Sequence, residues 1–163
     1  MIIRSYRDTD LQALKEITAI CFDGVCIDQN IEKQVGKIDG KSWQWRKVRH
    51  IDADVGANVK GIFVAEKDHQ IIGYITTRVD HETKVGGIPN ISVLPDHQGA
   101  GVGRVLMRTA MTYFQAQGMH YTRIETLDQN KIGADFYPNM GFKEVARQIH
   151  YLMPIPAPDQ VDL

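Results

Sequence analysis

The stretch VLPDHQGAGVGRVLM, residues 93–107, decides how this chain is interpreted. Three glycines alternate at Gly99, Gly101 and Gly103, and an amphipathic run follows them directly. Because glycine has no Cβ, the backbone N–H groups can converge and a ligand can approach the main chain closely. The first turn of the following helix adds unpaired N–H groups and the positive end of its dipole. The stretch therefore predicts an anion site, most naturally for a phosphate or pyrophosphate.

The periodicity of the chain predicts antiparallel strands followed by a single βαβ unit. A short strand opens the chain, a helix follows Asp8, and one or two helices are expected between residues 24 and 61. Alternating apolar residues predict a hairpin at 62–79, and Pro89 predicts an irregularity in the next strand. After the loop, the expected elements are a helix at 102–117, a strand at 121–127, a short helix at 129–140 and a last strand at 142–153. This order predicts one mixed α+β domain over residues 1–153, with a mostly antiparallel central sheet flanked by helices, and a proline-rich tail over 154–163.

The size and composition of the chain are typical of one soluble domain. It has 163 residues, of which 43% are hydrophobic and 24% charged, and its formal net charge is −1. These values exclude a global basic field that would favour nucleic acid, and the apolar runs are too short for a membrane span. Cys21 and Cys26 lie outside any metal-ligand spacing, and the first residues lack the apolar stretch of a signal peptide. We therefore expect a cytoplasmic protein with reduced, packed cysteines, no metal, and neither nucleic acid nor membrane as a partner.

Two other phosphate-binding loops compare less well with this stretch. A nucleoside-triphosphate loop needs Lys followed by Ser or Thr after its last glycine, and Arg104 and Val105 stand there. A dinucleotide fingerprint, G-x-G-x-x-G, finds its first two glycines in GAGVGR, and Glu125 lies near the distance of the acidic ribose ligand. However, Arg104 takes the place of the third glycine, and the single βαβ unit lies late in the chain. A dinucleotide-dependent enzyme is therefore the weaker alternative.

Two motifs in the second half resemble those of the GCN5-related N-acetyltransferase (GNAT) superfamily. QGAGVG at 98–103 is similar to its Q/R-x-x-G-x-G/A motif, and a V-x-P-like turn at 93–95 precedes it. NKIGADFYPNMGF at 130–142 resembles the segment N-x-x-A-x-x-x-Y-x-x-x-G-F, except that Gly133 stands in the place of the alanine. The close resemblance covers residues 88–142, and the motif spacing is nearest to that of ribosomal-protein N-terminal acetyltransferases.

This resemblance implies the GNAT acyl-CoA fold, in which the central sheet splays at its two parallel strands. Acetyl-CoA would be the co-substrate, with its pyrophosphate on the backbone N–H groups of residues 99–104 and its pantetheine arm along 91–93. The thioester would enter the gap between the strands, which a bulge at Pro89 and Asn90 would open. The cofactor-binding residues implied are Ile91, Ser92, Val93, Gln98, Gly99, Ala100, Gly101, Val102, Gly103, Arg104, Asn130 and Tyr137.

The same resemblance assigns catalytic roles to two side chains. In amine acetylation the acceptor ammonium must lose a proton, the oxyanion needs a donor, and the departing thiolate needs a proton. Tyr137 matches the family position of the general acid, although an aromatic residue there also fits simple core packing. Glu125 matches a glutamate base on the strand beyond the gap, and its alternative reading is an exposed acid paired with an arginine. Further candidates for the base are Asp128, His81, Glu82 and His97, and the oxyanion donor would be a backbone N–H of the strand 91–93.

The function that follows is transfer of an acetyl group to a primary amine of a small molecule or a protein N-terminus. Trp43 and Trp45 cannot share one helix face, so one is expected in the core and the other at the acceptor pocket or a subunit contact. The run RKVRH at 46–50 is expected to be a solvated helix face, and Asp80 with Glu82 is a candidate pair for a cationic amine. A non-catalytic acyl-CoA-binding module is the alternative to an enzyme. A homodimer built by the last strand and the tail is expected by analogy with the fold.

Overall fold

Helices and strands follow the predicted order as far as the helix α5. In the computed structural model, which describes residues 1–157, the first half contains β1 (Ile2–Ser5), α1 (Leu11–Cys21), α2 (Ile27–Val35), α3 (Trp43–Asn58), β2 (Phe63–Lys67) and β3 (Gln70–Ile75). The second half contains β4 (Val85–Ile88), β5 (Ile91–Val93), α4 (Val102–Ala116), β6 (Tyr121–Ile124) and α5 (Lys131–Asn139). Short 3₁₀ turns, Asp8–Asp10, Val59–Gly61 and Pro95–His97, precede α1, β2 and the glycine loop.

The central sheet has two parts. β4 belongs to one part and β5 to the other, and only residues 89 and 90 separate the two strands along the chain. β1, β2, β3 and β5 form an antiparallel sheet in that order, and β4 pairs in parallel with β6. A bridge between Arg78, just after β3, and Gly87 in β4 joins the two parts. Thr76 and Arg78 are two positions apart, whereas their partners Asn90 and Gly87 are three positions apart. The extra residue is a β-bulge between β4 and β5, where Pro89 and Asn90 lie. The irregularity predicted there is confirmed.

The bulge separates β5 from β6. β4 and β6 stay paired as far as Ile88 and Ile124, and no ladder joins β5 to β6 within residues 1–157. β5 is held instead on its other edge, by antiparallel pairing with β3. The sheet therefore splays at its two parallel strands, as the resemblance implies, and one edge of β5 faces the resulting gap.

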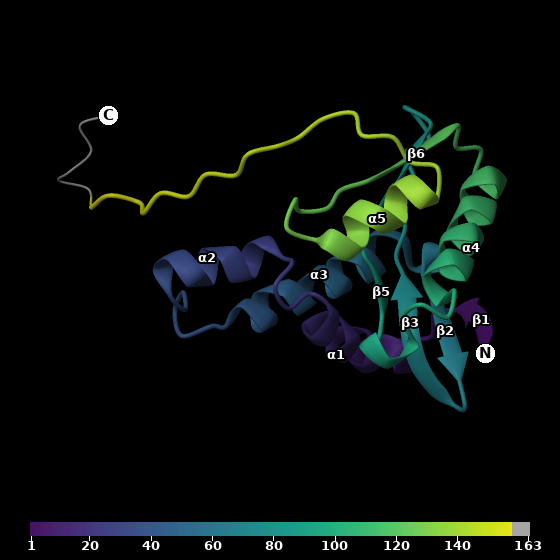
Figure 1. Ribbon diagram of the computed structural model, residues 1–163, viewed down its shortest axis with the longest axis horizontal. Coiled ribbons are helices and arrows are strands. Elements are labelled where there is room, and N and C mark those ends of the chain that lie inside the picture. Colours follow the sequence, from purple (N-terminus) through teal and green to yellow (C-terminus); the bar gives the residue numbers. More distant parts are fainter. Residues whose placement is uncertain (158–163) are drawn as a thin grey trace.

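Helices cover both faces of this sheet (Figure 1). α1 and α3 pack on one face, around a core that includes the fully buried residues Leu14, Ile51 and Tyr74. α4 covers the other face with Leu106 and Met107, which are also fully buried, and the aromatic residues of α5 pack against the same core. The result is the mixed α+β fold that the sequence predicts, with the gap lying between the two helical layers.

The segment over residues 24–61 forms two helices, α2 and α3. Ser42 caps α3 by accepting a hydrogen bond from the N–H of Trp45 at 3.3 Å. Gly56 lies inside α3 and does not interrupt the helix. Trp43 is buried and Trp45 is 44% exposed, which confirms that the two rings take different faces.

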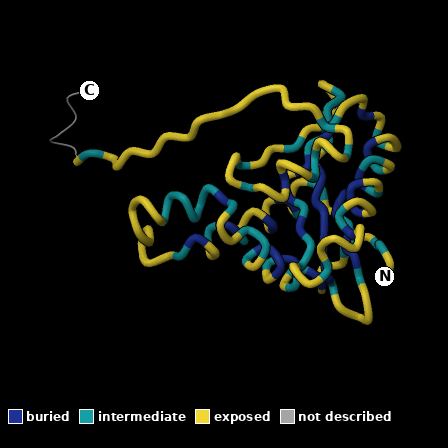
Figure 2. Tube along the Cα trace, in the orientation of Figure 1, coloured by how far each residue is buried: buried dark blue, intermediate teal, exposed yellow. Residues whose placement is uncertain are grey.

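The strand predicted over 142–153 is not formed. The N–H of Phe142 makes the last backbone hydrogen bond among the described residues, to Tyr137. Every residue from Lys143 to Ile155 is exposed, and the segment runs away from the sheet (Figures 1 and 2). Its alternating apolar pattern pairs with no strand edge among the described residues, and a lone extended segment is not a strand. The tail expected at 154–163 is described only as far as residue 157, and the rest of it lies outside the described residues.

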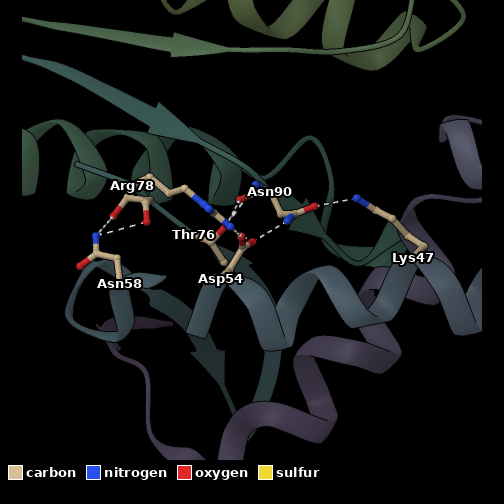
Figure 3. A network of polar contacts seen from close by, with 7 residues as sticks. Lys47, Asp54, Asn58, Thr76, Arg78 and Asn90 are labelled. Atoms are coloured by element: carbon tan, nitrogen blue, oxygen red, sulfur yellow. Dashed lines mark hydrogen bonds and ion pairs between the residues drawn. The ribbon is translucent and has the colours of Figure 1, made fainter. Parts of the chain in front are cut away.

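A buried carboxylate beneath the bulge ties α3 to the sheet (Figure 3). Asp54 is 1% exposed, and its Oδ2 accepts hydrogen bonds from Thr76 Oγ1 at 2.8 Å and from Asn90 Nδ2 at 2.6 Å. Its Oδ1 accepts a hydrogen bond from Arg78 Nη2 at 2.9 Å. On the other side of the amide, Lys47 Nζ donates to Asn90 Oδ1 at 2.8 Å. Both polar atoms of the Asn90 side chain are therefore paired, which fixes the residue at the bulge.

Replacing Asp54 with alanine should lower the free energy of unfolding by about 3 kcal/mol, because Asn90 and Thr76 would keep buried polar groups without a partner. Asp52→Ala is the matched control in the same helix. Its carboxylate is 48% exposed and pairs with Lys15 at 2.7 Å, so we expect a change below about 0.5 kcal/mol. Urea denaturation followed by circular dichroism measures both, and equal losses would contradict a special role for Asp54.

Candidate active site

The edge of β5 that faces the gap carries free backbone donors. Asn90 O and Leu94 N bond to the β3 side of the sheet, so the even-numbered residues of this strand direct their backbone groups toward β3. Backbone groups alternate between the two edges of a strand, so those of Ile91 and Val93 point into the gap. The side chain of Ser92 is buried on the opposite face from α4. The gap is thus bordered by two N–H groups that the sheet does not use.

The glycine loop follows β5 and opens α4. Gly99 and Gly101 have φ angles of +76° and +82°, in the left-handed region that favours glycine. A Cβ added at either position would meet no atom within 4 Å, so the backbone conformation rather than crowding requires glycine. The first helical bond runs from Val105 N to Gly101 O, and the N–H groups of residues 99–104 have no backbone acceptor within the described chain. Six backbone donors are therefore left without a backbone acceptor in one short stretch at the positive end of α4.

The loop, β5 and α5 converge at one place. A Cβ added at Gly103 would lie 3.5 Å from the Phe136 ring and 3.8 Å from Val93 Cγ2, so the first turn of α4 touches both neighbours. Gln98 Nε2 donates to Val93 O at 2.9 Å and fixes the start of the loop against the end of the strand. Arg104 is exposed on the first turn of α4. The residues predicted to bind the cofactor on β5 and in the loop are thus neighbours in space.

Asn130 begins α5 and explains a departure from the family motif. Its Oδ1 accepts a hydrogen bond from Gly133 N at 3.1 Å, and its Nδ2 donates to Thr126 Oγ1 at 2.9 Å. A Cβ added at Gly133 would lie 2.8 Å from Asn130 Nδ2 and 3.0 Å from the Tyr137 ring. Glycine therefore replaces the usual alanine because the cap and the tyrosine leave no room for a methyl group. Asn130 acts here as a helix cap, and its role toward a cofactor stays a prediction.

Tyr137 lies on α5 with its ring packed among other aromatic side chains. Its ring meets those of Phe136 and Phe142 edge to face, with centroids 5.6 and 6.0 Å away. The hydroxyl forms no hydrogen bond with any described residue, and burial raises the pKa of Tyr137 to about 12. The phenol therefore keeps its proton at neutral pH and has a hydrogen-bond donor to offer. Packing and proton donation are both compatible with this position.

Glu125 directly follows β6, at the point where the splay begins, and its side chain is in contact with solvent. Its side chain is 78% exposed and lies 3.8 Å from Arg123 Nη1. β6 is exposed at alternate residues rather than buried. The carboxylate is therefore in contact with solvent, as in its alternative reading, and any role as a base has to operate in the presence of water.

The other acid and histidine candidates lie on turns and loops outside the helices and strands. Asp128 is 90% exposed and lies 3.5 Å from Arg147, while His81 and Glu82 are exposed and His97 is half-buried. Asp80 Oδ1 accepts hydrogen bonds from the N–H groups of Glu82 and Thr83, and these bonds lower the pKa of Asp80. Asp80 thus holds its own turn together, which is the ordinary role of such a residue.

One face of α3 lines a cavity of about 440 Å³ beside the bulge. The sequence suggested a solvated face for the run at 46–50, but Lys47 is buried and its neighbours border this cavity. Its lining includes Asp28, Trp45, Arg49, His50, Arg78 and Asn90. Trp45 and Arg49 are four residues apart on α3, and this spacing was the sequence signal that the two side chains share one helix face.

Metal ligands and membrane helices are not found in the part of the chain that is described. Residues 1–157 contain no group of three or more His, Cys, Asp or Glu side chains that could hold a metal ion. None of their helices combines the length and apolar character that a bilayer span requires. Cys21 and Cys26 are free thiols, and burial raises the pKa of Cys21 to about 11. The cysteines therefore fit packing better than catalysis.

A family model and a curated relative match this chain. The model of the acetyltransferase (GNAT) domain covers residues 58–144, just over half of the chain. A mycothiol acetyltransferase of Thermomonospora curvata is 28% identical over 115 residues, which are 71% of this chain and 38% of that protein. The matched region thus spans well under half the length of this relative.

Solved structures share the fold at low sequence identity. PH1933 from Pyrococcus horikoshii OT3 has a TM-score of 0.72 and 21% identity, with 90% of this chain and 91% of that chain covered. The PaiA N-acetyltransferase of Thermoplasma acidophilum, solved in complex with coenzyme A, has a TM-score of 0.70 and 20% identity, with 87% and 89% covered. With the splayed sheet and the glycine loop in place, the family match shows that this chain belongs to the GNAT acetyltransferase family.

Proposed function

We propose that this chain is an acetyl-CoA-dependent N-acetyltransferase that transfers an acetyl group to a primary amine by direct attack on the thioester. The observation that carries the proposal is the gap between β5 and β6, which begins at the bulge and is bordered by the N–H groups of Ile91 and Val93. Family membership supports acetyl transfer as the reaction, and so does the name of the mycothiol acetyltransferase relative.

Acetyl-CoA fits the donors that the structure leaves free. The pyrophosphate suits the N–H groups of residues 99–104 at the start of α4, because both the donors and the helix dipole favour an anion. An extended arm that carries amide groups can pair with a free strand edge as another strand would, which assigns the pantetheine to residues 91–93. Gln98 orders the loop, and Arg104 supplies an exposed cation beside it.

The chain's own groups can then serve each proton and charge of the reaction. The neutral amine nitrogen attacks the carbonyl carbon, a C–N bond forms and the C–S bond breaks. The N–H of Ile91 or Val93 stabilises the negative charge that develops on the carbonyl oxygen. Glu125 accepts the amine proton, directly or through water, since its carboxylate is exposed. Tyr137, whose pKa is raised to about 12, donates a proton to the departing sulfur.

The two alternatives make different demands on the structure. A non-catalytic acyl-CoA-binding module would keep the loop and the gap but would not depend on Glu125 or Tyr137. A dinucleotide-dependent enzyme would need a doubly wound sheet. Within residues 1–157, β4 and β6 form one parallel pair beside an antiparallel sheet. The second alternative therefore has no support from the topology.

Gly101→Ala should weaken coenzyme A binding at least about tenfold, which corresponds to about 1.4 kcal/mol. Alanine is strained at a φ of +82°, so the loop must move and its N–H groups lose their common direction. Gly118→Ala is the control, because Gly118 has a φ of +72°, also has open space around it, and lies past the other end of α4. Isothermal titration calorimetry measures both, and equal dissociation constants would contradict the loop assignment.

The double variant Glu125→Gln/Tyr137→Phe should bind coenzyme A normally but acetylate about 10²-fold more slowly or worse. Thiol release from acetyl-CoA with a panel of amines, amino acids and N-terminal peptides measures the rate. Glu16→Gln/Tyr121→Phe makes the same chemical changes at two exposed positions and should keep the rate. Unchanged turnover in the first variant would remove both side chains from the mechanism and favour a role for other groups.

A cytoplasmic location is part of the proposal. Both cysteines are free, and Cys26 is buried. Burial raises the pKa of each thiol, which suits packing in a reducing compartment.

We also propose that the chain forms a homodimer through its C-terminal segment, with residues 1–153 as the catalytic domain and 154–163 as a tail. Val145 is 96% exposed and Tyr151 is 90% exposed, and the free edge of β6 has no strand beside it within residues 1–157. Exposed apolar side chains in a row together with an open strand edge mark an interaction surface. A second copy offers the same edge and the same segment. In a symmetric dimer, the C-terminal segment of each copy would pair with the β6 edge of the other.

Val145→Glu/Ile149→Glu should convert the dimer to a monomer, because charged side chains would then face the partner sheet. The control Val35→Glu changes an exposed valine of α2, which is 47% exposed, and should leave the mass unchanged. Size-exclusion chromatography with light scattering gives the mass of each protein. A monomeric parent chain at high concentration would contradict the dimer.

A further inference from the structure

The cavity beside the bulge has the size and the place of an acceptor site. Its volume of about 440 Å³ falls within the range of small-molecule pockets, about 300 to 1,000 Å³. Pro89 and Asn90 form part of its wall and also form the bulge that opens the gap. The wall of the cavity therefore ends at Asn90, directly before the first residue of β5.

The two carboxylates of the cavity are already paired. Asp54 accepts three hydrogen bonds, from Thr76, Arg78 and Asn90, and lies at 1% exposure (Figure 3). Asp28 Oδ1 lies 3.5 Å from Arg46 Nε, and its Oδ2 lies 3.8 Å from the ring of His50. A ligand ammonium would have to compete with guanidinium groups for both carboxylates. The cavity is therefore poorly suited to a purely cationic ligand.

Two arginines that line the cavity have free hydrogen-bond donors on exposed side chains. Arg78 gives one Nη2 bond to Asp54, is 50% exposed, and keeps its other N–H groups unpaired among the described residues. The Arg49 side chain donates no hydrogen bond within residues 1–157, and its guanidinium lies 4.7 Å from the centroid of the Trp45 ring. A guanidinium stacked on an aromatic face keeps its N–H edge available for a planar anion.

A further cation lies behind the wall of the cavity, in addition to Arg46, which pairs with Asp28. Lys47 is 7% exposed and reaches Asn90 Oδ1 at 2.8 Å, while its Nζ lies 3.8 Å from the centroid of the Phe22 ring. Burial lowers the pKa of Lys47, and burial together with Lys47 lowers the pKa of His50. His50 therefore adds no charge to the cavity at neutral pH, whereas Arg49 and Arg78 keep their guanidinium groups beside it.

We propose that this cavity binds the acceptor through an anionic group, a carboxylate or a phosphate, that the acceptor carries in addition to its amine. The proposal rests on the acetyl transfer proposed above and adds the chemical class of its acceptor. Arg49 and Arg78 hold the anion, since planar guanidinium groups match both carboxylate and phosphate. Trp45 covers the apolar part of the ligand, and the amine reaches past Asn90 toward the edge of β5.

Matched acceptors test this assignment. Thiol release from acetyl-CoA is measured with 4-aminobutyrate against 4-aminobutanamide, and with 2-aminoethyl phosphate against 2-aminoethanol. We expect kcat/KM to be at least about tenfold higher for the anionic member of at least one pair, and the pair with the larger ratio separates carboxylate from phosphate. Neutral members that are used as well as the anionic ones, or anionic members that are not used, would overturn the proposal.

Variants then assign the preference to the arginines. Arg49→Gln/Arg78→Gln should bring the ratio within each pair close to one, chiefly through KM, whereas Lys67→Gln on the distant hairpin should preserve it. Because Arg78 also bonds to Asp54, Arg49→Gln alone is the second variant, and it breaks no hydrogen bond within residues 1–157. An unchanged ratio in both arginine variants would remove the anion from this cavity.

Two further measurements distinguish a failure of the acceptor assignment from a failure of the proposed function. Calorimetry with coenzyme A tests the cofactor site alone. A chain that binds no coenzyme A loses the proposed function, and one that acetylates neutral amines equally well loses only the acceptor class. Trp45 lines the cavity, so the better anionic acceptor should change the tryptophan fluorescence of the parent chain but not that of Trp45→Phe. The same change in both proteins would place the ligand elsewhere.

Discussion

The hydrogen bond from Asn90 to Asp54 is the contact on which the rest of the site depends. Without the extra residue at the bulge, β5 would continue the line of β4 beside β6, and the gap would be closed by an ordinary ladder. A bulge leaves polar groups that the ladder no longer pairs. Here Thr76 Oγ1 accepts a hydrogen bond from the backbone N–H of Asn90 at 3.0 Å, and Asp54 of α3 in turn accepts bonds from the side chains of both residues. The helix that lines the cavity therefore also supports the bulge that opens the gap.

Local rules explain why much of the site could be predicted from the sequence. Gly99 and Gly101 need a left-handed backbone, Pro89 cannot continue a ladder, and the helix after the loop shows its apolar stripe. Each of these properties belongs to a residue and its near neighbours. The cavity is different, because Arg49, Arg78 and Asn90 come from separate elements and meet only through packing. The sequence therefore predicted only a solvated helix face for the basic run at 46–50 on α3.

The C-terminal segment shows a second reason why sequence patterns have limits. Its alternating residues have the period of a strand, yet a strand needs an edge to pair with, and the pattern does not say which edge. Gly133 shows the converse case, in which a departure from a motif became clear only with coordinates. The contacts of Asn130 and Tyr137 exclude a methyl group there, so the change preserves the geometry of the cap.

The charges around Asp54 connect the bulge to the choice of ligand. A buried carboxylate left alone would be costly, and three donors stabilise it here. Those same bonds occupy its oxygens, so Asp54 cannot also receive an ammonium group without giving up a partner. Asp54 neutralises only part of the positive charge of Arg49 and Arg78, because Arg49 is not its partner and Arg78 donates a single hydrogen bond to it. An anion on the acceptor would complete this balance, whereas a second cation would oppose it. The residue that fixes the gap thereby also sets the sign of charge that the cavity prefers.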